Sequence, residues 1–370
     1  MKDKKVHRFP VYVVKRMDLP KWKYWLIRAG GILLAFLVAG ITCEILRPGT
    51  FGTFYEEMIV GCFDFSDFSI IIDLLVTFSV LLTIAIALTP AFKMKFWNIG
   101  AEGQVLIGAM AAAGIAKFAN PDLPNFMILI FCALGSVAAS VIWSVIPAIF
   151  KAFFNTNETL FTLMLNYIAT IISAMMISIW IKNGSQSFGV LSQGVFPEIF
   201  DHSGFLVIII VLGIFAQMFF YIKKSKHGYE ISVVGESRDT ASYIGINVKK
   251  VIIRTMVLSG VIFGLLGFML VCGVNQSFND SLVGGKGFTG VLIAWLGHFE
   301  PLEIALFSFL AAVFEQGTSN AASAVNMSSI QFSAICTGMF FFIIIACEFF
   351  SRYQIKVHHK KEEGKYELSN

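Results

Sequence analysis

The chain has 370 residues, of which 56% are hydrophobic and 14% are charged, and its mean hydropathy is +0.75. The apolar residues fall in repeated runs of about 20, the length of helix that spans a bilayer core of roughly 30 Å. This composition predicts an all-α polytopic membrane bundle of about eight to ten transmembrane helices. The net charge is +4, but Lys and Arg lie between the apolar runs without base-stacking aromatics, so no nucleic-acid partner is expected.

The apolar runs predict eight full spans and two shorter segments in the second half of the chain. The full spans lie near 25–46, 69–89, 98–118, 126–150, 159–181, 204–222, 251–273 and 328–350, and the short segments near 288–298 and 302–317. Basic residues gather in alternate connections, which predicts cytoplasmic N- and C-termini. The number of crossings is then even. It is ten if both short segments cross, and eight if they form one re-entrant hairpin over 288–317.

The chain is expected to form one membrane domain in the cell membrane. Residues 1–24 form a basic cytoplasmic segment, residues 25–350 a transmembrane domain, and residues 351–370 a basic cytoplasmic tail. The outer loops at 47–68 and 183–203 are too short to fold as domains. The six cysteines are expected to pack in apolar segments, so neither a metal site nor a cofactor is predicted.

Three polar residues open the third apolar run: Asn98, Glu102 and Gln104. In hydrocarbon, each unpaired polar group costs several kcal/mol, so such residues face a bundle interior or a water-filled cavity. Asn98 and Glu102 lie one helical turn apart and can converge on one ligand group. We expect them to line a path for a small-molecule solute. Alternatively, Glu102 holds neighbouring helices together.

A second polar cluster lies in the fifth run, where Thr162 and Asn166 share a helical stripe and Tyr167 follows. An amide beside an aromatic ring suits a nucleoside, which needs hydrogen bonds and a flat face, although hydrogen bonding between helices would explain the same residues. The short segments after Gly287 suggest broken helices that border a solute site, with Phe288 and Trp295 as candidate contacts.

The long inner loop at 223–250 contains a predicted short helix over residues 236–243. An acid lies in its first turn, and Gly245 provides a left-handed stop. Such a helix between two spans can bind a cytoplasmic partner, although a solvated loop has the same composition. The sequence around Gly284–Gly287 lacks the Ser/Thr and spacing of a P-loop, so any ATPase must be another chain, and no catalytic residue is expected.

Together these motifs resemble the permease subunits of ATP-binding cassette (ABC) importers, in the branch that handles nucleosides and simple sugars. The resemblance rests on Asn98-Ile-Gly-Ala-Glu-Gly-Gln104, Asn157-Glu158, Thr162 to Tyr167, Gly235 to Asn247, Gly287-Phe-Thr-Gly290, and Leu296-Gly297 with Pro301. It runs in order from about residue 70 to residue 350. Permeases for ribose and branched-chain amino acids are more distantly similar.

The resemblance implies a second homologous permease, two cytoplasmic ATPase subunits or a tandem ATPase, and an extracellular substrate-binding lipoprotein. It also implies a coupling helix that contacts the ATPase through Gly235, Glu236, Ser237, Arg238, Tyr243 and Gly245. Ser237 and Asp239 stand where Asn and Pro are common in the family, which leaves the individual contacts open.

Three functional alternatives remain at this point. The solute is a nucleoside, a simple sugar or a riboflavin-type vitamin, because all present hydroxyl groups. An ion-coupled secondary transporter would use Glu102 as a protonation site and would need no ATPase. A channel or structural scaffold fits less well with spans that are interrupted by glycine.

Overall fold

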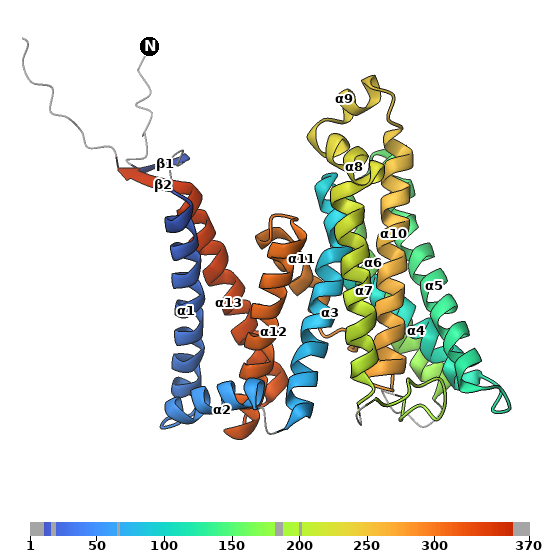
Figure 1. Cartoon of the computed structure of the whole chain (residues 1–370), viewed down its shortest axis with the longest axis horizontal. Helices are drawn as coiled ribbons and strands as arrows, with labels where there is room; N and C mark the ends of the chain where they lie inside the picture. The colour runs from blue at the N-terminus through green and yellow to red at the C-terminus, as the bar shows by residue number, and fades with distance from the viewer. Residues whose placement is uncertain (1–10, 16–19, 65–66, 182–187, 200–201, 358–370) are drawn as a thin grey trace, which may run out of the picture. The chain divides into compact units, whose positions relative to one another are not determined.

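The computed structural model describes residues 11–15, 20–64, 67–181, 188–199 and 202–357 (Figure 1). Over these residues the chain forms helices and one two-stranded sheet. The helices are α1 (Lys21–Leu46), α2 (Phe51–Phe63), α3 (Phe68–Lys93), α4 (Ala101–Phe118), α5 (Asn125–Phe154), α6 (Glu158–Trp180), α7 (Gly204–Lys224), α8 (Lys226–Glu236), α9 (Arg238–Tyr243), α10 (Val248–Met269) with its π-helical end η1 (Leu270–Val274), α11 (Lys286–Leu296), α12 (Pro301–Ala324) and α13 (Ser329–Arg352), and the strands are β1 (Val11–Lys15) and β2 (Tyr353–Val357).

The predicted all-α membrane bundle is confirmed. Each predicted apolar run coincides with a helix, and seven of the described helices are long and apolar enough to cross a membrane: α1, α3, α5, α6, α7, α10 and α13. The others that match predicted runs are α4, α12 and the 11-residue α11. The protein is therefore a multi-pass membrane protein.

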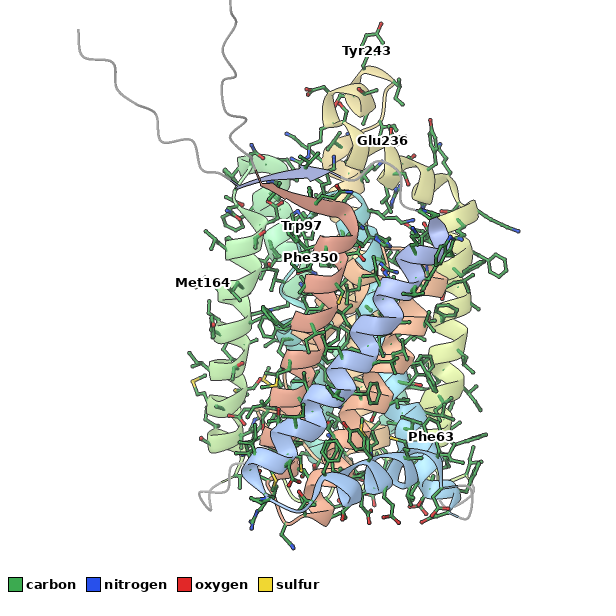
Figure 2. All side chains as sticks on the ribbon, turned by 90° about the vertical axis from the view of Figure 1, so that its left-hand side faces the viewer. Phe63, Trp97, Met164, Glu236, Tyr243 and Phe350 are labelled. Atoms are coloured by element: carbon green, nitrogen blue, oxygen red, sulfur yellow. The ribbon has the colours of Figure 1, made fainter. Side chains whose placement is uncertain are left out.

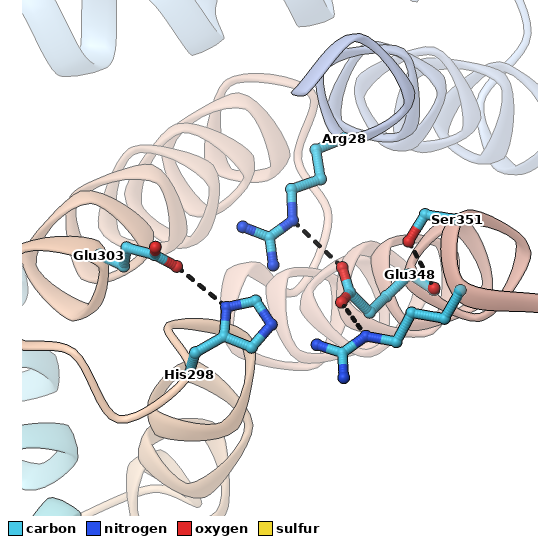
Figure 3. Close-up of polar contacts among 6 residues, drawn as sticks. Arg28, His298, Glu303, Glu348 and Ser351 are labelled. Carbon is cyan, nitrogen blue, oxygen red and sulfur yellow. Dashed lines mark hydrogen bonds and ion pairs between the residues drawn. The ribbon is translucent and has the colours of Figure 1, made fainter. Parts of the chain in front are cut away.

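The chain divides into two compact units, one of residues 1–55 with 321–370 and the other of residues 56–320. In the first unit, α1 packs against α13, and Arg28 Nε lies 3.1 Å from Glu348 Oε2 with both side chains 2% exposed (Figure 3). Arg352 Nε also donates to Glu348 Oε1, at 2.6 Å. Strands β1 and β2 pair antiparallel, with Val11 opposite Val357. The start of α1 and the end of α13 therefore lie on the same side of this unit, as an even number of crossings requires.

The second unit is centred on α3 and α10, whose most apolar stretches are 67% and 72% buried. Glycines let α10 approach α5 closely. A Cβ added to Gly264 would lie 2.6 Å from Val137 Cα, and Ser136 Oγ donates to Gly264 O at 2.6 Å. Small residues allow such backbone contact, which van der Waals packing and short hydrogen bonds then stabilise.

The helices α11 and α12 run in opposite directions through the second unit. Glu300, which follows α11, pairs with Lys93 at the end of α3 (3.0 Å) and with Lys223 near the end of α7 (3.2 Å). This is the end where α8 and α9 lie, and it is called the α8–α9 end below (Figure 1). Near the end of α12, Asn320 Nδ2 donates to Gly61 O in α2, which precedes the start of α3. The chain therefore reaches the α8–α9 end through α11 and returns through α12, and the number of membrane crossings stays a prediction.

Three details differ from the outline predicted from the sequence. Helix α2 occupies the predicted outer loop, because Phe54, Met58 and Cys62 recur every fourth residue and bury one face. Helix α8 occupies the first part of the predicted inner loop. Helix α4 begins at Ala101 rather than at Asn98, because the preceding segment is unwound. Parts of the predicted loop at 183–203 and of both terminal segments lie outside the described residues.

We expect Gly264→Ala to destabilise the protein by about 1–3 kcal/mol, because the new methyl group would meet the Val137 backbone, which cannot rotate away. The matched control is Gly213→Ala in α7, where a Cβ meets nothing within 4 Å and Ala gains up to about 1 kcal/mol of helix propensity. Thermal unfolding of both purified variants in one detergent measures the difference. Equal melting temperatures would contradict the close α5–α10 contact.

Candidate functional site

The chain leaves helical geometry between α3 and α4, and side chains satisfy the backbone there. Lys95 has a φ of 57°, and the helix resumes at Ala101. Asn98 Oδ1 accepts from Gly100 N at 3.0 Å, while Asn98 Nδ2 donates to Gln104 Oε1 at 3.1 Å. Asn98 is 0% and Gln104 1% exposed. The two carboxamides therefore replace hydrogen bonds that a continuous helix would make for itself.

Two residues of α6 complete this arrangement. Thr162 Oγ1 accepts from Ile99 N at 3.1 Å and donates to Glu158 O at 2.8 Å. Asn166 Oδ1 accepts from Gly103 N at 2.9 Å, and its Nδ2 donates to Ile99 O at 2.8 Å. Asn166 thus binds both the unwound segment and the first turn of α4, whose N–H groups have no partner within the helix.

Glu102 connects α4 to a second interruption in the chain. Its Oε1 accepts from Gly285 N at 2.8 Å, and its Oε2 accepts from Gly287 N at 2.7 Å. The carboxylate therefore caps the N-terminus of α11, where the helix dipole favours negative charge. Gly285 has a φ of 81°, and a Cβ on Gly287 would lie 2.6 Å from the Glu102 carboxylate. Gly287 is required by this close approach, whereas Gly285 is required by its left-handed backbone, since nothing lies within 4 Å of a Cβ there.

The structure brings together five of the predicted path residues and separates the other three. Asn98, Glu102, Gln104, Thr162 and Asn166 form the hydrogen-bonded region described above, with Glu102 alone partly exposed. Tyr167, Phe288 and Trp295 are exposed, at 59%, 41% and 38%. Met164 lies on the outward side of α6 (Figure 2), and Tyr167, three residues further on, is exposed on the same face of the helix, whereas Asn166 is buried. Contact of any of these residues with solute stays a prediction.

The predicted coupling helix is two helices rather than one. Ser237 has extended backbone (φ −154°), so α8 ends at Glu236, and its hydroxyl accepts from Thr240 N at 3.2 Å to cap α9. The predicted helix over 236–243 was therefore wrong in its first two residues, because Ser is favoured at the N-cap of a helix more than in its interior. The predicted stop is present, since Gly245 has a φ of 86°.

One side of α8 and α9 packs against the ends of three long helices. Ile231, Val234 and Ala241 are buried in a common cluster with residues of α3, α5 and α10. At Gly235, a side chain would collide with Lys93 O, so α8 touches the backbone at the end of α3. A movement of α8 toward α3 would therefore press directly on the α3 backbone.

The other side of α8 and α9 is exposed and partly apolar. Tyr243 is 92% exposed at the tip of α9, and Tyr229 and Ile244 are 62% and 52% exposed (Figure 2). Glu236 is exposed at the end of α8, and Arg238 is half-buried at the start of α9. These elements connect two membrane spans and are not themselves long apolar helices. Large apolar groups outside the spans are typical of a protein interface.

Ion pairs that the sequence motifs did not reveal join these elements. Glu300 pairs with Lys93 and Lys223. Arg254 Nη2 of α10 donates to Glu230 Oε2 of α8 at 2.7 Å, which holds the pKa of Glu230 below its ordinary value of 4.5. Charged residues at helix ends are common in any membrane protein, so spacing alone gave no signal for these pairs.

Comparisons with known proteins place the chain in a family. Residues 70–346 match the family described as branched-chain amino acid transport system / permease component. A guanosine ABC transporter permease of Bacillus subtilis is 31% identical over 64% of this chain and 69% of its own length. A nucleoside ABC transporter permease of Lactococcus lactis subsp. cremoris is 30% identical over 65% of this chain and 70% of its own length. A glucose ABC transporter permease of Haloferax volcanii is 24% identical over 92% of each chain.

The chain belongs to this permease family. The family match covers most of the sequence and confirms the resemblance to ABC importer permeases. An ABC permease is a transport component rather than an enzyme, and it acts together with ATPase and permease partners. The buried polar region and the α8–α9 surface both belong to the permease, within the matched residues.

We expect Asn166→Ala to destabilise the permease by about 1–3 kcal/mol, because Gly103 N and Ile99 O would lose their hydrogen-bond partner between packed helices. Tyr167→Ala is the matched control on the same helix, since its exposed side chain does not bridge α4. The melting temperatures of both variants, from thermal unfolding in one detergent, measure the difference. A melting temperature for Asn166→Ala as high as that of Tyr167→Ala would show that α4 does not depend on this bridge.

The Glu230–Arg254 pair predicts a pH-dependent attachment of α8 to α10. Because the pKa of folded Glu230 is lowered, the pair stabilises α8 above about pH 4.5, and this contribution disappears as the pH falls through the folded pKa. At pH 7, Glu230→Gln should lower the opening free energy of α8 by about 1 kcal/mol, the value of a partly exposed pair. Hydrogen exchange of α8 amides measures it.

Glu236→Gln is the control for this comparison, because Glu236 is exposed at the end of the same helix. The difference between Glu230→Gln and the native protein should shrink as the pH falls below 4.5 and vanish below the folded pKa of Glu230. A difference that persists in acid would mean that the carboxylate charge is not what attaches α8.

Proposed function

We propose that this permease is the membrane subunit of an ATP-driven importer for nucleosides. An extracellular binding lipoprotein delivers the solute, two ATPase subunits or a tandem ATPase hydrolyse ATP, and a second homologous permease completes the transporter. The names of the relatives at 30% and 31% identity support nucleosides as the solute. A simple sugar or riboflavin is the alternative, supported by the glucose permease above and by a probable riboflavin import permease of Treponema pallidum at 23% identity.

The observation that carries the ATP-driven mechanism is the two-sided α8–α9 element. Its inner side is fixed to the ends of α3, α5 and α10, and its outer side presents Tyr243 and Ile244. An ATPase that closes on the exposed side would therefore move the ends of three spans together. An ion-coupled secondary transporter would have no use for an exposed apolar surface that is rigidly attached to its bundle.

We place the α8–α9 end in the cytoplasm, together with both termini. Lys93, Lys151, Lys223 and Lys224 all lie at helix ends on this side of the second unit, as the positive-inside rule favours. Strands β1 and β2, which belong to the two basic terminal segments, pair with each other at one side of the first unit. The solute then moves from the opposite, outer end toward the α8–α9 end.

The proposal is tested by reconstituting the permease with its ATPase and binding protein in proteoliposomes. Uptake of a labelled nucleoside should require ATP and should be reduced by unlabelled purine and pyrimidine nucleosides more than by ribose, glucose or riboflavin. If ATP-dependent uptake is reduced only by an unlabelled sugar or only by riboflavin, the solute is that sugar or riboflavin and not a nucleoside. Uptake that needs no ATPase and is abolished by a protonophore would establish the secondary transporter instead.

Coupling through α9 gives a matched pair of variants at one position. Gly245→Val should uncouple ATP hydrolysis from uptake, because a β-branched residue is strained at a φ of 86° and the turn after α9 would shift. Gly245→Asn should retain coupling, since Asn tolerates this conformation. Arg238→Ala should also uncouple while the subunits still assemble. Coupling is measured as the number of nucleosides transported per ATP hydrolysed. If both Gly245→Val and Arg238→Ala keep the native value of this ratio, the role of α9 in coupling is overturned.

A further inference from the structure

An ion pair joins α11 to α12 at a depth where membrane proteins rarely place charge. Lys286 Nζ lies 3.2 Å from Glu315 Oε1, and the two side chains are 29% and 23% exposed. Helix α11 has 11 residues and is followed by Glu300 at the α8–α9 end, so its first residue lies roughly 16 Å from that end at 1.5 Å per residue. This is about the middle of a hydrocarbon core of roughly 30 Å.

Contact with lipid does not account for the exposed part of this pair. A charged group at the bilayer centre costs several kcal/mol unless it faces a bundle interior or a water-filled cavity. Lys286 is the first residue of α11 and is too far from either membrane surface for its side chain to reach headgroups. The partly exposed ammonium and carboxylate must therefore face a polar space or another polar molecule.

The chemistry around the pair restricts what that molecule can be. The N–H groups of Gly285 and Gly287 at the start of α11 already bind Glu102, so this helix end is closed to an anion from solution. Glu102 and Glu315 carry two negative charges against the one positive charge of Lys286. A site with this excess repels phosphates and carboxylates. It offers both a charged donor and a charged acceptor to a neutral solute.

We propose that Lys286 and Glu315 bind the transported solute, and that this solute is a neutral molecule with a vicinal diol. The carboxylate accepts from the two hydroxyls, and the ammonium donates to one of their oxygens. Glu102 positions Lys286 by fixing the start of α11 and contributes the charge that excludes phosphorylated analogues. The inference rests on the import function proposed above, but not on the choice among nucleoside, sugar and riboflavin, since each carries adjacent hydroxyls.

The first test compares uptake of uridine and 2′-deoxyuridine by the complete transporter at saturating binding protein. The native protein should prefer uridine by about tenfold or more, the value of a hydrogen bond to a charged group. In Glu315→Gln and Lys286→Met, the preference should fall to within about twofold, while the binding protein stays the same. Glu303→Gln is the matched control on α12, because Glu303 pairs with His298 at the α8–α9 end (Figure 3) and should keep the native preference.

An equal loss of uptake for both nucleosides in Glu315→Gln and Lys286→Met would mean that the pair only supports the fold, and an unchanged preference would mean that it does not touch the diol. Either result overturns the proposal. If the native transporter takes up glucose rather than nucleosides, the nucleoside assignment fails, and glucose and 2-deoxyglucose replace the two nucleosides in the same comparison.

A second test does not depend on transport. Lys286→Cys and Glu315→Cys in the assembled transporter should react with a water-soluble, membrane-impermeant methanethiosulfonate reagent. Ile209→Cys, 52% exposed in the apolar α7, should not. The native protein gives the background from its own cysteines. Failure of both Lys286→Cys and Glu315→Cys to react would show that no aqueous space reaches the pair, and would overturn the proposal whatever the solute.

Discussion

The structure of the permease depends on one constraint, that backbone groups in a bilayer core must find partners within the protein. The chain breaks helical geometry before α4 and again before α11, and each break leaves N–H groups that no helix satisfies. Asn98 and Asn166 supply partners at the first break, and Glu102 at the second. The polar residues that look costly in the sequence are thus what makes two interrupted helices possible.

A series of contacts connects the second break to the α8–α9 end. Gly235 lets α8 touch the backbone of Lys93, and the Lys93 side chain pairs with Glu300 after α11. At its other end, α11 is held by the Glu102 carboxylate through Gly285 and Gly287. One packing contact, one ion pair and two hydrogen bonds thus link α8 to α4 through α3 and the 11-residue α11.

The sequence predicted the order and approximate limits of the apolar helices because apolar length is a direct consequence of bilayer thickness. It did not predict α2 or α8, which are short and gain their stability from packing one face on other helices rather than from their own composition. The β1–β2 pairing could not be predicted either, since it joins residues more than 300 positions apart in the sequence. The limits of α9 depended on whether one serine caps or continues a helix, a choice that propensity leaves open.

At the candidate site, residue type alone does not distinguish a contact with solute from a contact with the backbone. Asn98, Glu102 and Asn166 were correctly singled out as residues that lipid would not tolerate, but polarity at membrane depth has two solutions, a solute or the backbone itself. In this conformation the backbone is the partner that the structure provides for all three. Lys286 and Glu315 satisfy each other and still keep part of their surface exposed. A path is therefore better sought among charged groups that pair and remain accessible than among amides that are fully used in the fold.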